Sequence, residues 1–287
     1  MPLPEEYNRR CQEYNRHMKN MVILIASLLA SLAVALVLYS LGPDTSATGK
    51  MSWLRKNKEA ENRLLSIPVL LYHNIDGKGP FSIDAATMRE HFQLIRDRGI
   101  RVIPLRELIR RLDNPVPYGD RVIVITFDDG YGSMFHKLLP LAREFDYPVT
   151  LFVSTDMISL KSSKNLTWRE LREMDRSGID IQCHSISHKD LVQLSKSRDT
   201  SSRRSLYEEL YLSKRILELY LRKKVDFYAF PFGRYDLNVI DLAANSGYSR
   251  VFSTDYGSNV ITRDNYCLRR HHIKSSYSLD YIDSLIR

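Results

Sequence analysis

Three features of the sequence predict an α/β fold built on a parallel sheet. Short, apolar, β-branched runs alternate with amphipathic stretches about seven times from residue 64 onward, as in chains that form βαβ units. Several of these runs end directly in polar residues, which is where parallel sheets carry their functional groups. An uncharged apolar stretch, Met21–Leu41, precedes them. We therefore expect a barrel or an open doubly wound sheet, preceded by one transmembrane helix.

Residue type and spacing give the expected elements in order. The predicted strands are Ile67–Tyr72, Arg101–Ile103, Arg121–Phe127, Pro148–Val153, Ile179–Cys183, Val225–Phe230, Tyr248–Ser253 and Cys267–Ile273. The predicted helices are Ala85–Arg98, Leu105–Leu112, Ser133–Phe145, Trp168–Arg176, Ser205–Arg222 and Leu237–Ser246. The expected organisation is a cytoplasmic segment at 1–20, a transmembrane anchor at 21–41, a linker at 42–63 and one catalytic domain at 64–287.

The anchor is predicted from the length of the apolar stretch. Met21–Leu41 contains no charged residue and, as a helix, spans roughly 30 Å, the thickness of a bilayer core. A cleaved signal peptide would have a shorter apolar core and a nearby cleavage site with small residues. Arg16 and Lys19 before the stretch, against Lys50 after it, favour a cytoplasmic N-terminus. The expected location is the cell membrane, with a single pass and the catalytic domain outside the cytoplasm.

Composition is that of an ordinary globular protein. Of the 287 residues, 44% are hydrophobic and 26% are charged, and the formal net charge is +8. The basic residues are scattered rather than clustered, so we do not expect a nucleic acid partner. None of the three cysteines, Cys11, Cys183 and Cys267, sits in a CxxC pair. A zinc ribbon or a redox dithiol is therefore not indicated, and we interpret Cys183 and Cys267 as buried thiols rather than a disulfide.

Two strand ends carry residues that suggest a metal centre. The run up to Phe127 leads into the adjacent carboxylates Asp128 and Asp129, which are costly beside a buried strand unless something balances their charge. By themselves they could equally be a helix cap before a turn. Another strand leads into His184 and His188, whose spacing of four residues allows both to face one metal ion. Two imidazoles and one carboxylate form a facial triad, which leaves the second carboxylate free to act as a base.

Three motifs in this order resemble one family. TFDDGY at 126–131, HSISH at 184–188 and FPFG at 230–233 are similar to the polysaccharide deacetylases, the fourth carbohydrate esterase family. The resemblance covers roughly residues 66 to 273, and VLLYHNI at 69–75 is similar to the branch that acts on poly-N-acetylglucosamine. It implies a distorted (β/α)7 barrel. It also implies that Asp128 is the general base and that Asp129, His184 and His188 bind the metal ion.

The same resemblance assigns the oxyanion contact and the general acid. It places a backbone N–H at Phe232, between Pro231 and Gly233, against the developing oxyanion. Tyr72-His73-Asn74 is similar to the acid motif of the poly-N-acetylglucosamine branch, so His73 is the expected acid. His271, in a Leu268-Arg-Arg-His271 sequence similar to the family's LxxH motif, is the second choice, and His272 is a third.

One position departs from the family pattern. Many members carry an arginine two residues before the motif proline, where it orients the base, but this chain has Ala229 there. Arg269 or Arg270 is a possible replacement.

The expected activity is metal-dependent hydrolysis of N-acetyl groups on an extracytoplasmic polysaccharide that contains N-acetylglucosamine. Zinc is the default metal, although two histidines and one aspartate also accept iron, cobalt or nickel. Expected partners are the polysaccharide, the membrane through the N-terminal helix, and a polysaccharide synthesis or export machinery. The alternatives are an esterase that removes O-acetyl groups, a non-catalytic carbohydrate-binding relic, and an iron oxygenase. Retention of all four site residues argues against the relic, and the ligand spacing argues against the oxygenase.

Overall fold

The structure is a computed structural model that describes residues 66–286 except 115, 117, 160–163 and 261–265. The predicted cytoplasmic segment, anchor and linker lie outside these residues. Among the residues described, no helix is both long and apolar enough to cross a bilayer. The described residues all belong to one unit of the chain, Glu59–Arg287.

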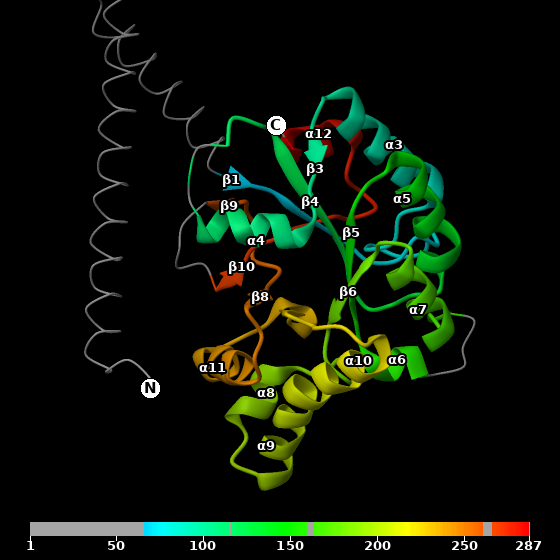
Figure 1. Cartoon of the computed structure of the whole chain (residues 1–287). Coiled ribbons are helices and arrows are strands. Elements are labelled where there is room, and N and C mark those ends of the chain that lie inside the picture. The colour runs from blue at the N-terminus through cyan, green and yellow to red at the C-terminus, as the bar shows by residue number, and fades with distance from the viewer. Residues whose placement is uncertain (1–65, 115, 117, 160–163, 261–265, 287) are drawn as a thin grey trace, which may run out of the picture. The chain divides into compact units, whose positions relative to one another are not determined.

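A parallel sheet forms the centre of this unit (Figure 1). Its strands pair in the order β10-β8-β7-β6-β5-β4-β2-β11, with β3 beside β4, and a separate pair is formed by β1 and β9. The strands are β1 (Ser66–Ile67), β2 (Val69–Tyr72), β3 (Arg101–Val102), β4 (Val122–Phe127), β5 (Val149–Val153), β6 (Asp180–Cys183), β7 (Phe227–Ala229), β8 (Arg250–Phe252), β9 (Asn259–Val260), β10 (Cys267–Leu268) and β11 (His271–His272).

One short segment of chain reaches both ends of this sheet. β10 pairs in parallel with β8, and β11, only two residues further on, pairs in parallel with β2. The predicted strand Cys267–Ile273 is thus two strands, interrupted at Arg269 and Arg270. Because the same segment supplies both the first and the last strand of the path, the sheet curls into a barrel-like shape. The predicted α/β class with a parallel, barrel-like sheet is confirmed.

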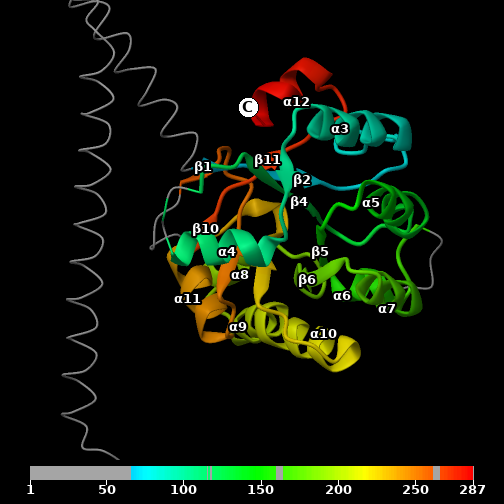
Figure 2. The ribbon, with the colours of Figure 1, turned by 45° about the horizontal axis from the view of Figure 1, so that its top comes forward.

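The helices connect successive strands. They are α3 (Ala85–Asp97), α4 (Leu105–Asp113), α5 (Leu139–Phe145), α6 (Thr155–Ser159), α7 (Trp168–Arg176), α8 (Leu191–Lys196), α9 (Thr200–Tyr207), α10 (Ser213–Leu221), α11 (Leu237–Asn245) and α12 (Leu279–Ile286). Figures 1 and 2 show α3, α5 and α7 following one another along one side of the sheet, with α12 beside α3. One π-helical turn, Met134–Leu138, precedes α5, and another, Glu208–Leu212, precedes α10.

Side chains alternate between two buried clusters along the strands, as the pleat requires. Ile123, Ile125 and Phe127 of β4 join the cluster that packs against α3 and α5 on the outer face. Val122 and Val124 join a second cluster, together with residues of α4, on the inner face of the curled sheet. Since both faces are covered by apolar groups, every residue of β2, β4 and β5 is buried. This alternation decides which polar residues beyond the strand ends point inward.

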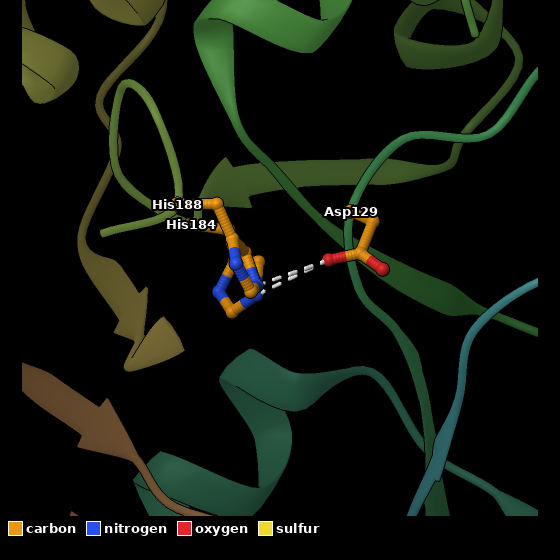
Figure 3. A group of neighbouring side chains, drawn as sticks. All are labelled: Asp129, His184 and His188. Atoms are coloured by element: carbon orange, nitrogen blue, oxygen red, sulfur yellow. Dashed lines mark ion pairs between the residues drawn. The ribbon is translucent and has the colours of Figure 1, made fainter. Parts of the chain in front are cut away.

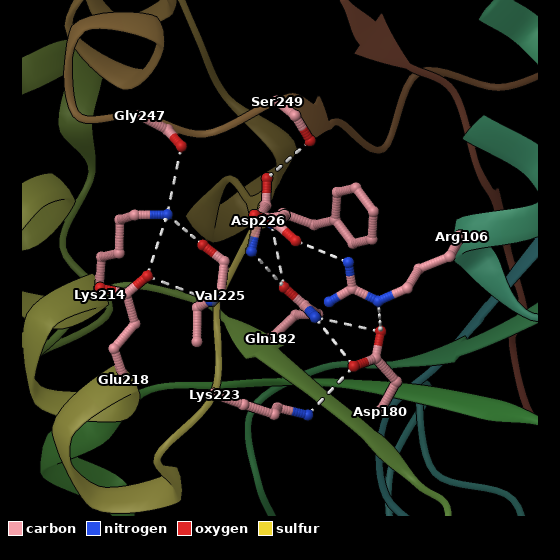
Figure 4. A network of polar contacts seen from close by, with 11 residues as sticks. Arg106, Asp180, Gln182, Lys214, Glu218, Lys223, Val225, Asp226, Gly247 and Ser249 are labelled. Carbon is pink, nitrogen blue, oxygen red and sulfur yellow. Dashed lines mark hydrogen bonds and ion pairs between the residues drawn. The ribbon is translucent and has the colours of Figure 1, made fainter. Parts of the chain in front are cut away.

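A polar network holds β6 and β7 together at the amino ends of the strands (Figure 4). The backbone register between these two strands contains a single residue pair, Cys183 with Tyr228. Oε1 of the buried Gln182 accepts the N–H groups of Asp226 and Phe227, at 3.0 Å each. Arg106 of α4 donates to Asp226 at 2.6 Å. The side chains therefore replace backbone pairing at this end, opposite the strand ends that carry the candidate site.

Candidate metal and hydrolase site

The site begins with residues that continue the inner face past the strand ends. Val122, Val124, Thr126 and Asp128 share one side of β4, and the N–H of Asp128 still donates to the carbonyl of Tyr72 at 3.0 Å. On β6 the outward Cys183 is followed by the inward His184, whose N–H donates to Val153. Leu71 of β2 is followed on the same side by His73. The sheet itself thus gathers Asp128, His184 and His73 at one edge.

Asp129, His184 and His188 form a compact donor set (Figure 3). The Nε2 atoms of His184 and His188 lie 3.5 and 3.4 Å from the same oxygen, Oδ1 of Asp129. Zinc bonds of about 2.0–2.1 Å in tetrahedral geometry place neighbouring donor atoms about 3.3 Å apart. Two imidazole nitrogens and one carboxylate oxygen at this spacing therefore fit a divalent metal ion.

A second contact orients His184 for metal binding. Its Nδ1 lies 2.8 Å from the carbonyl oxygen of Ala229, so that nitrogen carries the proton and Nε2 keeps its lone pair. Burial alone would lower the pKa of His184, but the charges of Asp128 and Asp129 raise it above its ordinary value. The negative charge that favours a protonated imidazole here also favours the binding of a metal cation. The sequence had no signal for this role of Ala229, because a backbone carbonyl supplies it.

Asp128 has a different partner from its neighbour. Arg270 donates from Nη1 and Nη2 to the two oxygens of Asp128, at 2.8 and 2.7 Å, and neither residue is more than 2% exposed. Burial raises the pKa of Asp128, but Arg270, together with the charges of His184 and His73, outweighs burial and holds that pKa below its ordinary value. In the family pattern, an arginine at position 229 would orient this aspartate. In this chain Arg270 contacts Asp128 instead. Of the two candidates named from the sequence, the structure brings Arg270 to Asp128.

The interruption between β10 and β11 explains how Arg270 arrives there. Leu268 belongs to the inner cluster, and Arg270 continues on the same side, with its Nε donating to the carbonyl of Ser253 at 3.0 Å. Its guanidinium also lies 5.5 Å from the centre of the inward Phe152 ring. The stretch between the two ends of the sheet therefore carries the arginine into the inside of the barrel.

The three candidate acids fall into two places. His272 pairs in register with the inward Leu71 and its ring lies 4.7 Å from that of His73, so these two histidines share the inner face. His271 pairs with the outward Leu70, and its Nε2 lies 3.1 Å from Ser258 Oγ. The second choice made from the sequence, His271, thus points away from Asp128, and His272 takes its place beside His73. Alternation along a strand puts these two neighbours on opposite faces, but the sequence alone does not say which histidine faces the site.

Burial makes both inward histidines weak bases. The pKa of His73 lies below its ordinary 6.5 because burial outweighs the attraction of Asp128 and Asp129. Burial, with a smaller effect of His73, lowers the pKa of His272 to about 4. Nδ1 of His73 and Nε2 of His272 are buried and have no hydrogen-bond partner among the described residues. Such groups are expected to meet a ligand or water.

The expected oxyanion residues lie beside the candidate metal ligands. Pro231–Gly233 form a single 3-10 turn after β7, and the ring of the exposed Phe232 meets His188 edge-on, with centroids 4.6 Å apart. Phe232 adopts a φ of 59°, a left-handed conformation that is costly for this residue type. Asp129, Ser185 and His188 are also left-handed. Backbone strain of this kind clusters at functional sites.

Tyr131 is a site residue that the sequence did not single out. Partial burial, together with the charge and hydrogen bond of Asp129, raises the pKa of Tyr131 to about 12. The hydroxyl thus stays protonated and can donate to the carboxylate of Asp129, a candidate metal ligand. Its place in the motif at 126–131 was a signal, but neither composition nor spacing indicates which atom it contacts.

A parallel α/β sheet that collects one carboxylate with two histidines, and a second carboxylate held by arginine, defines a hydrolase-like site. Residues 116–251 match the family model of the polysaccharide deacetylases. Over 235 residues the chain is 25% identical to a putative polysaccharide deacetylase of Bacillus subtilis (strain 168), covering 82% of this chain and 77% of the relative. Residues 116–251 therefore form a domain of the polysaccharide deacetylase family, whose members are hydrolases.

Three further comparisons concern the branch and the fold. The poly-beta-1,6-N-acetyl-D-glucosamine N-deacetylase of Escherichia coli (strain K12) is 20% identical over 224 residues, which cover 65% of this chain but 33% of that relative. A Streptococcus pyogenes deacetylase solved with acetate superposes with a TM-score of 0.68 at 24% identity, covering 77% of this chain and 98% of that one. IcaB from Ammonifex degensii gives a TM-score of 0.68 at 20% identity, with 77% and 95% coverage. These two structures share the fold.

Proposed function

We propose that this protein is a metal-dependent deacetylase that hydrolyses N-acetyl groups on an extracytoplasmic polysaccharide containing N-acetylglucosamine. Its catalytic domain is a distorted (β/α)7 barrel in which Cys267–His272 counts as one interrupted strand. The observation that carries the proposal is the division between two adjacent aspartates. Asp129 directs one oxygen at two imidazoles, whereas Asp128 is held by Arg270, with its Oδ2 3.9 Å from Nε2 of His184.

The residues around the metal position supply the acid and base steps. A divalent metal ion, zinc by default, would supply an acidic water and polarise the acetyl carbonyl. Asp128, ionised because Arg270 lowers its pKa, takes a proton from the attacking water. His73, at the end of the neighbouring strand β2, gives a proton to the departing amine. The backbone N–H of Phe232 faces the developing oxyanion, a contact worth about 3 kcal/mol in the transition state.

The substrate class is tested by acetate release from a panel of purified glycans, each carrying either N-acetyl or O-acetyl groups. Release from N-acetylglucosamine polymers is the expected result. Release from O-acetylated glycans alone would make the protein an esterase that uses the same residues. No release from any glycan, with the metal bound, would indicate a carbohydrate-binding relic.

For location, we propose that residues 21–41 anchor the protein in the cell membrane with the catalytic domain outside the cytoplasm. The length and lack of charge of that stretch support the anchor, and the neighbouring Arg16 and Lys19 support its orientation. Such a position would bring the enzyme near polysaccharide synthesis or export machinery. Reporter fusions after Lys58 test the orientation, and a cytoplasmic signal would contradict it.

A further inference from the structure

The loop that carries both metal-binding histidines is held in a strained shape. It leaves β6 at His184 and turns through Ser185 and His188, whose φ angles are 79° and 57°. Left-handed conformations cost about 1–3 kcal/mol each for residues other than glycine, and they persist only where surrounding contacts impose them. Without such contacts, nothing would hold His188 near the Asp129 oxygen that His184 also approaches.

One side of this loop is held through its carbonyl groups. The N–H of Thr155 donates to the carbonyl of Ser185 at 3.1 Å, and the N–H of Asp156 donates to that of Ile186 at 3.0 Å. Both donors stand at the beginning of α6, directly after β5. These backbone bonds fix the loop against the neighbouring strand end.

The other side is held by one buried carboxylate, that of Glu209. Its Oε2 accepts the N–H groups of Ile186 and Ser187, each at 2.9 Å. Its Oε1 accepts the hydroxyl of Ser187. Glu209 is only 2% exposed, and the ammonium of Lys189 at 3.8 Å partly balances its charge. A buried side chain that receives three hydrogen bonds from one loop acts as a clamp, because moving the loop would leave its buried oxygens without hydrogen-bond partners.

A π-helical turn presents Glu209 to the loop. Within Glu208–Leu212 the helix widens, and the N–H of Ser213 donates to the carbonyl of Glu208. The carbonyl of Glu209 accepts instead from the Ser213 hydroxyl at 2.6 Å and the Tyr228 hydroxyl at 3.4 Å. Turns of this kind often mark functional positions in helices. Here the turn fixes the backbone from which the carboxylate reaches the metal-ligand loop.

We propose that Glu209 is a positioning residue of the metal centre: it holds the His184–His188 loop so that both imidazoles face Asp129. This inference rests on the proposed metal-dependent function. It predicts that the hydrogen bonds of Glu209, more than its charge, set the metal affinity. Loss of contacts behind metal ligands typically lowers metal affinity about 10- to 100-fold.

The test compares two conservative variants of the full-length protein. Glu209→Asp keeps the charge but is one methylene too short to reach both amides, whereas the amide oxygen of Glu209→Gln can still accept from both. Zinc affinity is measured by chelator competition, and amide hydrogen exchange is measured on metal-free protein. In Glu209→Asp we expect at least a tenfold loss of affinity and faster exchange at Ile186 and Ser187. Glu209→Gln should stay close to the parent in both measurements.

A matched control lies on the same long helical stretch. Glu218 of α10 accepts the N–H of Val225 at 3.3 Å, away from the metal ligands. Glu218→Ala should accelerate exchange at Val225 and leave both zinc affinity and the amides of Ile186 and Ser187 unchanged. The proposed clamp is overturned if Glu209→Asp keeps parent-like affinity and exchange, or if Glu209→Gln loses as much as Glu209→Asp. Failure of the parent protein itself to bind metal would instead overturn the proposed function.

Discussion

Asp128 and Asp129 are neighbours in the chain, yet they have separate partners, and we propose separate tasks for them. The distinction depends on Arg270, because a buried carboxylate without a countercharge would take up a proton and lose its value as a base. The pKa of Asp128 is lowered in the folded protein. The ionised pair with Arg270 therefore stabilises the fold at pH values above 3.8, the ordinary pKa of aspartate. That stabilisation is lost as the pH falls below 3.8 through the folded pKa.

Replacing Arg270 tests this pairing. Arg270→Met leaves Asp128 buried alone, which should raise its pKa, lower the free energy of unfolding by about 3–5 kcal/mol at neutral pH and greatly reduce turnover. Denaturant unfolding and acetate release measure these two effects. The double variant Arg270→Met, Asp128→Asn should regain stability without regaining activity. A single variant with parent-like turnover would show that Arg270 does not serve the base.

His73 is the predicted general acid, and its lowered pKa has a kinetic consequence. Donation requires the protonated imidazole, so the alkaline limb of kcat/KM should lie below pH 6.5, the ordinary value for histidine. His73→Ala should remove this limb while the metal content stays intact. His271→Ala, with its ring turned toward Ser258, is the control and should keep the parent profile. Near-normal turnover in His73→Ala would move the assignment to His272.

At the residue scale, the sequence could predict which candidate metal ligands come together, but not every contact behind them. Adjacent aspartates and a histidine pair at strand ends are visible in the chain, and their motifs resemble a known family. Arg270 could be named only as one of two candidates, because its position depends on where the last strand is interrupted. Glu209 left no local signal, since its partners at Ile186 and Ser187 are met only through the tertiary fold.

At the scale of elements, the FPFG turn depends on a close backbone approach. A Cβ added at Gly233 would lie 2.1 Å from Oγ1 and 2.5 Å from the backbone N of Thr254, and Gly233 also has a φ of 66°. Gly233→Ala should therefore displace the turn that carries Phe232 and lower both stability and turnover. Differential scanning calorimetry and acetate release measure the two losses.

Gly99 provides a matched control for this substitution. It has a similar φ of 62°, but no atom lies within 4 Å of the position of an added Cβ. Gly99→Ala should therefore cost only the conformational strain, about 1–2 kcal/mol, and leave turnover unchanged. Equal losses of stability and turnover in Gly233→Ala and Gly99→Ala would show that the close approach to Thr254 is unimportant.

The elements that the sequence predicts well are those whose own apolar pattern is strong. The strands around Val122–Phe127 and Val149–Val153 and the helices from Ala85 and Leu105 appear close to their expected bounds. Four short elements, α6, α8, α12 and β9, had not been expected. β9 has two residues and exists through its antiparallel pairing with β1, so local propensity could not reveal it.

At the scale of the whole molecule, the described domain contains its own core. Both hydrophobic clusters and all the candidate site residues lie within residues 66–286. A fragment from Leu64 to Arg287 should therefore fold and release acetate at a rate close to that of the full chain. Circular dichroism and turnover of the purified fragment check this. An insoluble or inactive fragment, beside an active full-length protein, would show that the preceding residues contribute to the fold or the site.

The central claim is that Asp129, His184 and His188 hold a metal ion that the reaction requires, with Asp128 as the base. The most direct measurement is acetate release from N-acetylglucosamine oligomers before chelation, after chelation and after zinc is added back. We predict loss and recovery for the parent protein. Asp129→Asn should lose both zinc and activity, whereas Asp128→Asn should keep zinc and turn over about 10²–10⁴ times more slowly. Full activity after chelation, with no metal remaining, would contradict the account.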